Sequence, residues 1–180
     1  MDTRKEIEKE VEECRTLFGK KTRDYGTSWR IMRLPSLTDQ IFIKANRIRS
    51  IQESGENRVG DDVRNEFVAM VNYAAIALIQ MDLGDGGDME IPIDEALALY
   101  DAKMATTLDL MLDKNHDYGE AWRQMRISSM VDLILMKLRR IKQIEDNGGV
   151  TIASEGVEGG YMDIINYSLF CLIRMTENNI

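Results

Sequence analysis

The chain has 180 residues, which is enough for one ordinary domain or for two small halves that share a core. Its 31 acidic residues outnumber the 23 basic ones and give a net charge of −8, so we expect no broad basic surface for duplex DNA or RNA. There are only two cysteines, a charged N-terminal stretch and no membrane-length apolar run, so we expect a cytoplasmic protein without disulfides, leader or membrane segment.

The first segment of the chain predicts an amphipathic helix over residues 3–19. Ile7, Val11, Cys14 and Phe18 recur at steps of three and four, with charged residues between them. Such a helix lies on the outside of a bundle. The stretch KTRDYGTSWRIMR follows from residue 21, where Gly26 permits a tight turn, so this stretch is expected to form the corner after the helix.

A second helix is predicted over residues 35–53, beginning at Pro35 and ending before Gly55. Apolar residues form one stripe along it, but Ile43 lies among polar residues on the opposite side. We therefore expect this helix to be buried on both sides, with Asp39 and Arg47 needing partners. Two interpretations fit: an ion-pair network that locks two halves together, or a site that faces a ligand.

A third helix over residues 61–83 is apolar almost all round, which predicts a central position in the fold. The stretch GDGGDMEIP then supplies turn residues for a linker over residues 84–90. After the linker the same order returns, with helices predicted over residues 93–113, 128–146 and 157–176.

An internal repeat explains this return. With a shift of 93 residues, 15 of the 31 positions in 21–51 are identical in 114–144, where chance would give roughly two. Asn72-Tyr73 and Asn166-Tyr167 match at a shift of 94. The sequence therefore predicts an all-α protein in which two tandem three-helix repeats, residues 1–83 and 91–180, share one core about a pseudo-twofold axis.

The repeated polar and aromatic residues are compatible with a packed corner or with a nucleotide site. In the second interpretation the aromatic side chains stack on a base and the cations hold phosphate oxygens. The candidates are Tyr25, Trp29, Arg30, Arg33, Lys44 and Arg47 in the first half, and Tyr118, Trp122, Arg123, Arg126, Lys137 and Arg140 in the second.

Carboxylates supply the hard oxygen ligands that Mg²⁺ prefers. The candidate metal ligands are Asp24, Asp39 and Glu66 in the first half and Asp117, Asp132 and Asp163 in the second, with Asp39 and Asp132 as the candidate catalytic residues. The only histidine, His116, has Arg23 as its counterpart, so a catalytic histidine shared by both halves and a histidine-rich zinc site are not expected.

The pattern DYG..WR.MR..S..D.I..K..RI resembles the nucleotide modification-associated domain 1 family, in two copies that cover most of the chain. A more distant likeness is to the all-α nucleoside triphosphate pyrophosphohydrolases of the MazG and dimeric dUTPase type. That likeness implies Mg²⁺-dependent cleavage between the α and β phosphates, carried out by an E-x-x-E and an E-x-x-D pair. The corresponding positions here are Ser36-x-x-Asp39, Ser129-x-x-Asp132, Glu66-x-x-Ala69 and Asp163-x-x-Asn166.

Two functional hypotheses follow from these residues. The first is a Mg²⁺-dependent hydrolase that acts on free or modified nucleoside triphosphates. The second is a non-catalytic module that binds a nucleotide or a protein of a modification pathway. The expected partner is a nucleotide or another phosphorylated small molecule rather than duplex nucleic acid or a membrane, and assembly into a homo-oligomer stays open.

Overall fold

The computed structural model describes residues 2–56, 62–152 and 156–180, and within these ranges the chain is helical with no strand. The first half contains α1 (Thr3–Tyr25), the 3₁₀ helix η1 (Ser28–Ile31), α2 (Leu34–Ser54) and α3 (Val63–Leu83). The second half repeats this order with α4 (Ile93–Tyr118), η2 (Ala121–Gln124), α5 (Ile127–Asp146) and α6 (Val157–Glu177). The predicted all-α class and the two-repeat organisation are confirmed.

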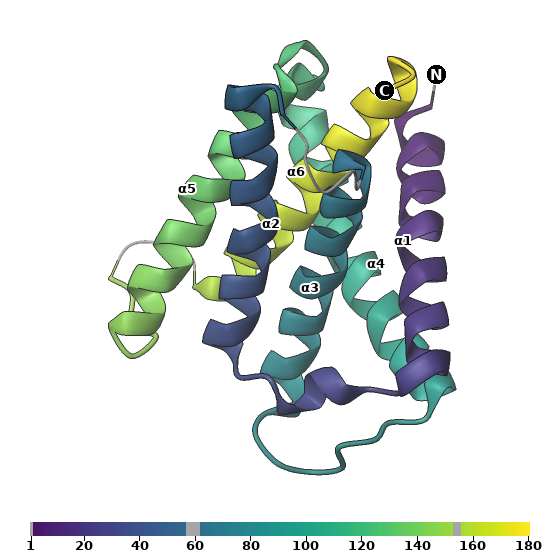
Figure 1. Cartoon of the computed structure of the whole chain (residues 1–180), viewed down its shortest axis with the longest axis vertical. Helices are drawn as coiled ribbons and strands as arrows, with labels where there is room; N and C mark the ends of the chain where they lie inside the picture. Colours follow the sequence, from purple (N-terminus) through teal and green to yellow (C-terminus); the bar gives the residue numbers. More distant parts are fainter. Residues whose placement is uncertain (1, 57–61, 153–155) are drawn as a thin grey trace.

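The helices pack in three layers, with α3 and α6 in the middle (Figure 1). α2 and α5 cover one side of this pair, and α1 and α4 cover the other. The double cover explains why α3 and α6 are apolar almost all round. α3 is long and apolar enough to span a membrane, but 72% of its apolar window is buried inside the protein, as expected for the core helix of a soluble protein.

Reciprocal contacts define the pseudo-twofold relation. Asp39 on α2 lies 3.9 Å from the Lys142 ammonium on α5, and Arg49 on α2 lies 3.6 Å from the Asp132 carboxylate on α5. Asp39 and Arg49 are each 93 residues before Asp132 and Lys142, so the second contact is the first with the halves exchanged. The axis therefore passes between α2 and α5, and the ion pairs join the two halves.

Two local predictions were wrong. The first helix of each half does not stop near residues 19 and 113 but continues to Tyr25 and Tyr118. Gly19 does not end α1, because it is buried inside the helix against Leu97 of α4. The helix ends instead at Gly26, whose φ of 71° lies in the region that favours glycine. The predicted start of the third helix at residue 61 lies outside the described residues.

The prediction that the second helix is buried on both sides was also wrong. Phe42 and Ile43 on the outer side of α2 are 47% and 51% exposed, whereas the described helices α3 and α5 pack against other sides of α2. An apolar residue on each side of a helix is therefore not enough to predict burial of both sides.

Candidate functional site

The repeated D-Y-G segment forms the last turn of the first helix in each half and directs the chain into a short 3₁₀ helix. Gly26 has a φ of 71°, which favours glycine, and a Cβ there would require the Glu90 carboxylate of the linker to move. Gln80 on α3 fixes the end of η1, since its Nε2 donates to the Met32 carbonyl oxygen at 2.9 Å. The turn thereby holds the Trp29 side chain in a buried position beside α3.

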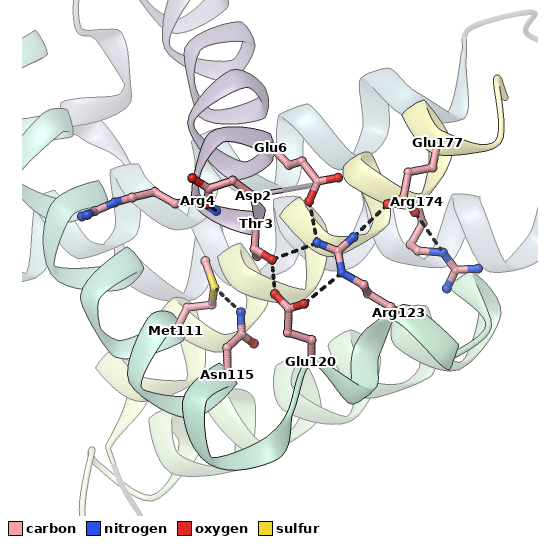
Figure 2. A network of polar contacts seen from close by, with 10 residues as sticks. All are labelled: Asp2, Thr3, Arg4, Glu6, Met111, Asn115, Glu120, Arg123, Arg174 and Glu177. Carbon is pink, nitrogen blue, oxygen red and sulfur yellow. Dashed lines mark hydrogen bonds and ion pairs between the residues drawn. The ribbon is translucent and has the colours of Figure 1, made fainter.

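Arg30 and Arg123, which are equivalent in the repeat, both bind other parts of the protein. The Arg30 guanidinium donates to the Gln80 side chain and to carbonyl oxygens of the linker at residues 84, 86 and 88. Arg123 pairs with Glu6 of α1 at 2.5 Å and with Glu177 of α6 at 2.8 Å (Figure 2). Their contacts indicate that both arginines hold the fold together rather than a phosphate.

Arg33 and Arg126 are exposed and stand immediately before α2 and α5. Their carbonyl oxygens accept from the backbone N–H of Ser36 and Ser129, at 3.0 and 3.1 Å, which begins each helix. Neither arginine lines the pockets described below.

A pocket of about 370 Å³ lies between α1, η1 and α3 in the first half. Tyr25, Trp29 and Tyr73 give it aromatic walls, and Lys21 is the lysine that lines it. Partial burial raises the pKa of the Tyr25 hydroxyl, and the nearby Tyr73 and Asp24 raise it further. The structure therefore places the two aromatic residues predicted to stack on a base in one pocket, but none of the other candidates of that half lines it.

The corresponding place in the second half is filled by the protein itself. Trp122 stacks on Phe170, with ring centroids 4.3 Å apart and planes 5° from parallel. The guanidinium carbon of Arg123 lies 4.3 Å from the centroid of the Trp122 ring. Tyr118 is exposed at the end of α4.

The lysine and arginine predicted on α2 meet a carboxylate of α3. Lys44 Nζ lies 3.7 Å from Glu66 Oε2, and an Arg47 guanidinium nitrogen lies 3.0 Å from Glu66 Oε1. The Glu66 side chain is buried, and a buried carboxylate needs positive partners. Lys44 and Arg47 supply them.

The equivalent lysine of the second half also meets a carboxylate, but in a wider cleft. Lys137 Nζ lies 2.9 Å from Asp163 Oδ2, and Lys114 Nζ of α4 lies 3.0 Å from Asp163 Oδ1. These residues line a cleft of about 850 Å³, together with Arg140. Arg140 is exposed and has no ion pair or hydrogen bond among the residues that the structure describes. Among the described residues that line the cleft, three are cations and one is a carboxylate.

The predicted aspartates do not gather at either place. Asp39 and Asp132 lie between α2 and α5 with side chains 61% and 63% exposed, and neither lines the cleft. Asp24 and Asp117 are exposed in the last turns of α1 and α4, where Asp117 lies 3.2 Å from His116 Nδ1. Within the described residues, no three His, Cys, Asp or Glu side chains are placed to hold one metal ion.

Comparison with protein families finds one family model that matches the chain in two segments. The model of the family described as nucleotide modification associated domain 1 matches residues 21–81 and again residues 114–175, which together are more than half of the chain. The chain belongs to the nucleotide modification associated domain 1 family. No curated protein and no solved structure matches it. The resemblance read from the repeated motif is confirmed, including its two tandem copies.

The two nucleotide modification associated domain 1 segments include every residue of the cleft and every residue predicted for a site. The sequence prediction combined residues that the structure separates into an aromatic pocket, two cation–carboxylate clusters and an interface between the halves. It missed Lys114 and Tyr73. A signal was available for both, because Lys21 and Lys114 are the first identical pair of the repeat and Tyr73 and Tyr167 belong to the Asn-Tyr match.

Proposed function

We propose that this family member binds the phosphate groups of a nucleotide in the cleft between α4, α5 and α6. The family description supports a nucleotide-related role. The observation that carries the proposal is the charge of the cleft: among its described lining residues, Lys114, Lys137 and Arg140 lie with one carboxylate, that of Asp163, in a chain whose net charge is −8.

The pseudo-twofold comparison explains why Arg140 has no ion pair among the described residues. Its counterpart Arg47 pairs with Glu66, whereas α6 carries Gly160 at the position that corresponds to Glu66. Without that carboxylate, Arg140 is a lining residue of the cleft. Arginine is well suited to phosphate because its planar group donates two parallel hydrogen bonds.

The lysines add donors to the same place. An ammonium has three N–H donors, and Asp163 takes one from Lys137, so others can reach a ligand. The volume of about 850 Å³ falls within the range of small-molecule sites, roughly 300–1,000 Å³. A nucleoside di- or triphosphate therefore matches the cleft in charge and in size.

In this proposal Mg²⁺ binds together with the triphosphate as a Mg²⁺-nucleotide complex. Asp163 and Glu66 are each held by two cations, so these carboxylates serve as counter-ions in the described structure. A Mg²⁺ ion carried by the nucleotide needs fewer protein ligands than one held by the protein alone. A hydrolase and a non-catalytic nucleotide-binding module both require binding of a nucleotide, which is the step that the geometry supports best. Hydrolysis between the α and β phosphates is tested on the same preparation.

The test is a calorimetric titration of the protein with ribo- and deoxyribonucleoside mono-, di- and triphosphates, with and without Mg²⁺. Arg140→Ala is expected to weaken binding about tenfold, the value of one charge-assisted hydrogen bond of roughly 1.5 kcal/mol. Arg139→Ala is the matched control, because Arg139 is the exposed neighbour on α5 that does not line the cleft.

The outcomes separate the alternatives. If no nucleotide binds, or if Arg140→Ala and Arg139→Ala bind as tightly as the natural chain, the phosphate cleft is wrong. Release of pyrophosphate from a bound triphosphate would add hydrolysis to the proposal. Binding without release would identify a non-catalytic nucleotide-binding module.

A further inference from the structure

We infer that the first half holds a second and different site, in which the pocket between α1, η1 and α3 takes a flat aromatic ring with an anionic group, as in a nucleoside 5′-monophosphate. This site is separate from the phosphate cleft, which lies in the other half. The inference rests on the second half of the same chain, where the equivalent space is occupied by side chains whose chemistry is known.

The correspondence between α3 and α6 is fixed by equivalent contacts. Asn72 Nδ2 donates to the Cys14 carbonyl oxygen at 3.1 Å, and Asn166 Nδ2 donates to the Thr107 carbonyl oxygen at 3.4 Å. Cys14 and Thr107 are 93 residues apart, and the two asparagines are 94 apart, as the repeat requires. In this register Ile76 corresponds to Phe170, and the counterpart of Asp163 is alanine.

The first difference concerns an aromatic ring. In the second half, the Phe170 ring lies parallel to the Trp122 indole at a centroid distance of 4.3 Å. In the first half, Ile76 replaces that ring and lines the pocket of about 370 Å³ beside Trp29. Stacking of a base on an aromatic side chain contributes about 1–3 kcal/mol. A ligand ring placed as Phe170 is placed would restore this contact.

The second difference concerns a negative charge. In the second half, Lys114 pairs with Asp163 at 3.0 Å. In the first half, the counterparts Lys21 and Ala69 both line the pocket, and Lys21 has no ion pair among the described residues. The lysine is therefore retained without its carboxylate. An anionic group on the ligand would supply the missing charge.

The spacing of the two missing groups sets the ligand class. Asp163 and Phe170 are seven residues apart on α6, which corresponds to about 10 Å along a helix. A single compact ring or a lone phosphate cannot provide both groups over that span. A nucleoside 5′-monophosphate carries a flat base at one end and an anion at the other, with a sugar as the spacer between them.

The sequence provides its own reporter for the test, because Trp29 and Trp122 are the only two tryptophans. In the Trp122→Phe variant, Trp29 emits alone, and the titrants are the eight common ribo- and deoxyribonucleoside 5′-monophosphates and their nucleosides. We expect a monophosphate to quench Trp29 and to bind several-fold more tightly than its nucleoside. Equilibrium dialysis against the natural chain repeats the measurement if the variant does not fold.

A matched pair of substitutions decides where the ring binds. Ile76→Phe imitates the second half and is expected to reduce the affinity for the monophosphate at least tenfold, whereas Ile76→Leu keeps the volume and the binding. Equal affinity for Ile76→Phe and the natural chain, or no binding by any titrant, would overturn the inference. Loss of binding in Arg140→Ala but not in Ile76→Phe would assign the ligand to the phosphate cleft and also overturn it.

Discussion

The replacement of Asp163 by asparagine tests the electrostatic account of the cleft, because stability and nucleotide binding are expected to change in opposite directions. The Asp163 carboxylate is buried and lies 3.0 Å from Lys114 and 2.9 Å from Lys137. Asparagine keeps the size of the side chain and removes its charge. Both ammonium groups then lose their counter-ion.

The loss of stability follows from the exposure of the two lysines. Removing one partner of a fully buried ion pair costs about 3–5 kcal/mol. Here the Lys114 and Lys137 side chains are 44% and 22% exposed and can turn toward water, so we expect about 1–3 kcal/mol. For a chain of 180 residues this lowers the melting temperature by about 3–8 °C.

The gain in affinity follows from Coulomb's law. A phosphate bound on the far side of the Lys137 ammonium would lie about 6 Å from the former carboxylate, where repulsion between unit charges is about 0.7–1.4 kcal/mol at an effective dielectric constant of 40–80. Asp163→Asn is therefore expected to bind the nucleotide about three- to tenfold more tightly. Differential scanning fluorimetry measures the first effect and calorimetric titration the second.

The matched control is Glu66→Gln in the first half. Glu66 is likewise held by two cations, Lys44 and Arg47, but lies outside the cleft. Its replacement is expected to lower the melting temperature in a similar way and to leave the affinity unchanged. If Asp163→Asn instead weakens binding of the Mg²⁺-nucleotide, Asp163 touches the metal or the substrate, and the account of it as a counter-ion is refuted.

Three further predictions concern titratable groups. Burial raises the pKa of the Glu145 carboxyl above its ordinary 4.5, so the native state binds this proton more tightly than the unfolded chain and stability falls as the pH rises above 4.5. Glu145→Gln should therefore have a higher melting temperature than the natural chain at pH 7 and the same one at pH 4. A lower melting temperature of the variant at pH 7 would contradict this. Burial raises the pKa of the Cys14 thiol to about 12 and that of Cys171 as well, so a thiol reagent at pH 8 should modify both only after unfolding, as counted by absorbance. Asp132→Asn removes an exposed contact with Arg49 and should change stability by less than about 1 kcal/mol in a denaturant titration; loss of any measured turnover in this variant would assign Asp132 to catalysis.

Much of the fold was predictable because the repeat and the apolar periodicity carry it. α3 and α6 are apolar almost all round, which is enough to place them in the middle layer. The C-terminal end of α1 was not predictable in this way, because Gly19 has the residue type of a helix end but is a buried residue inside the helix. Periodicity also gave no means to tell that Phe42 and Ile43 on the outer side of α2 are exposed.

The candidate site was predicted in its residue types but not in its grouping. Trp29 precedes α2, whereas Arg47 lies 13 residues after the first residue of that helix, a rise of about 20 Å. Residues that share a half of the sequence therefore belong to different regions of the bundle. Only contacts between helices bring Lys114 of α4 to Asp163 of α6, and no spacing within one helix reveals such a contact.

The repeat itself explains why the two halves offer different sites. Each half provides one acidic residue for the equivalent lysine of its second helix: Glu66 for Lys44 and Asp163 for Lys137. In the register of the repeat these acids are three residues apart, about one helical turn. The shift has two consequences.

At the position shared by Glu66 and Gly160, the glutamate of the first half pairs with Arg47. The glycine of the second half has no carboxylate for Arg140, which lines the cleft. At the position shared by Ala69 and Asp163, the aspartate of the second half pairs with Lys114. The alanine of the first half has no carboxylate for Lys21, which lines the aromatic pocket. Each half thus neutralises a cation whose counterpart in the other half has no ion pair among the described residues. One duplicated unit can in this way provide two anion sites of different shape. Adding the missing acid with Ala69→Asp should close the aromatic pocket to anions, whereas Gly160 has no room for a side chain unless Ile141 of α5 shifts.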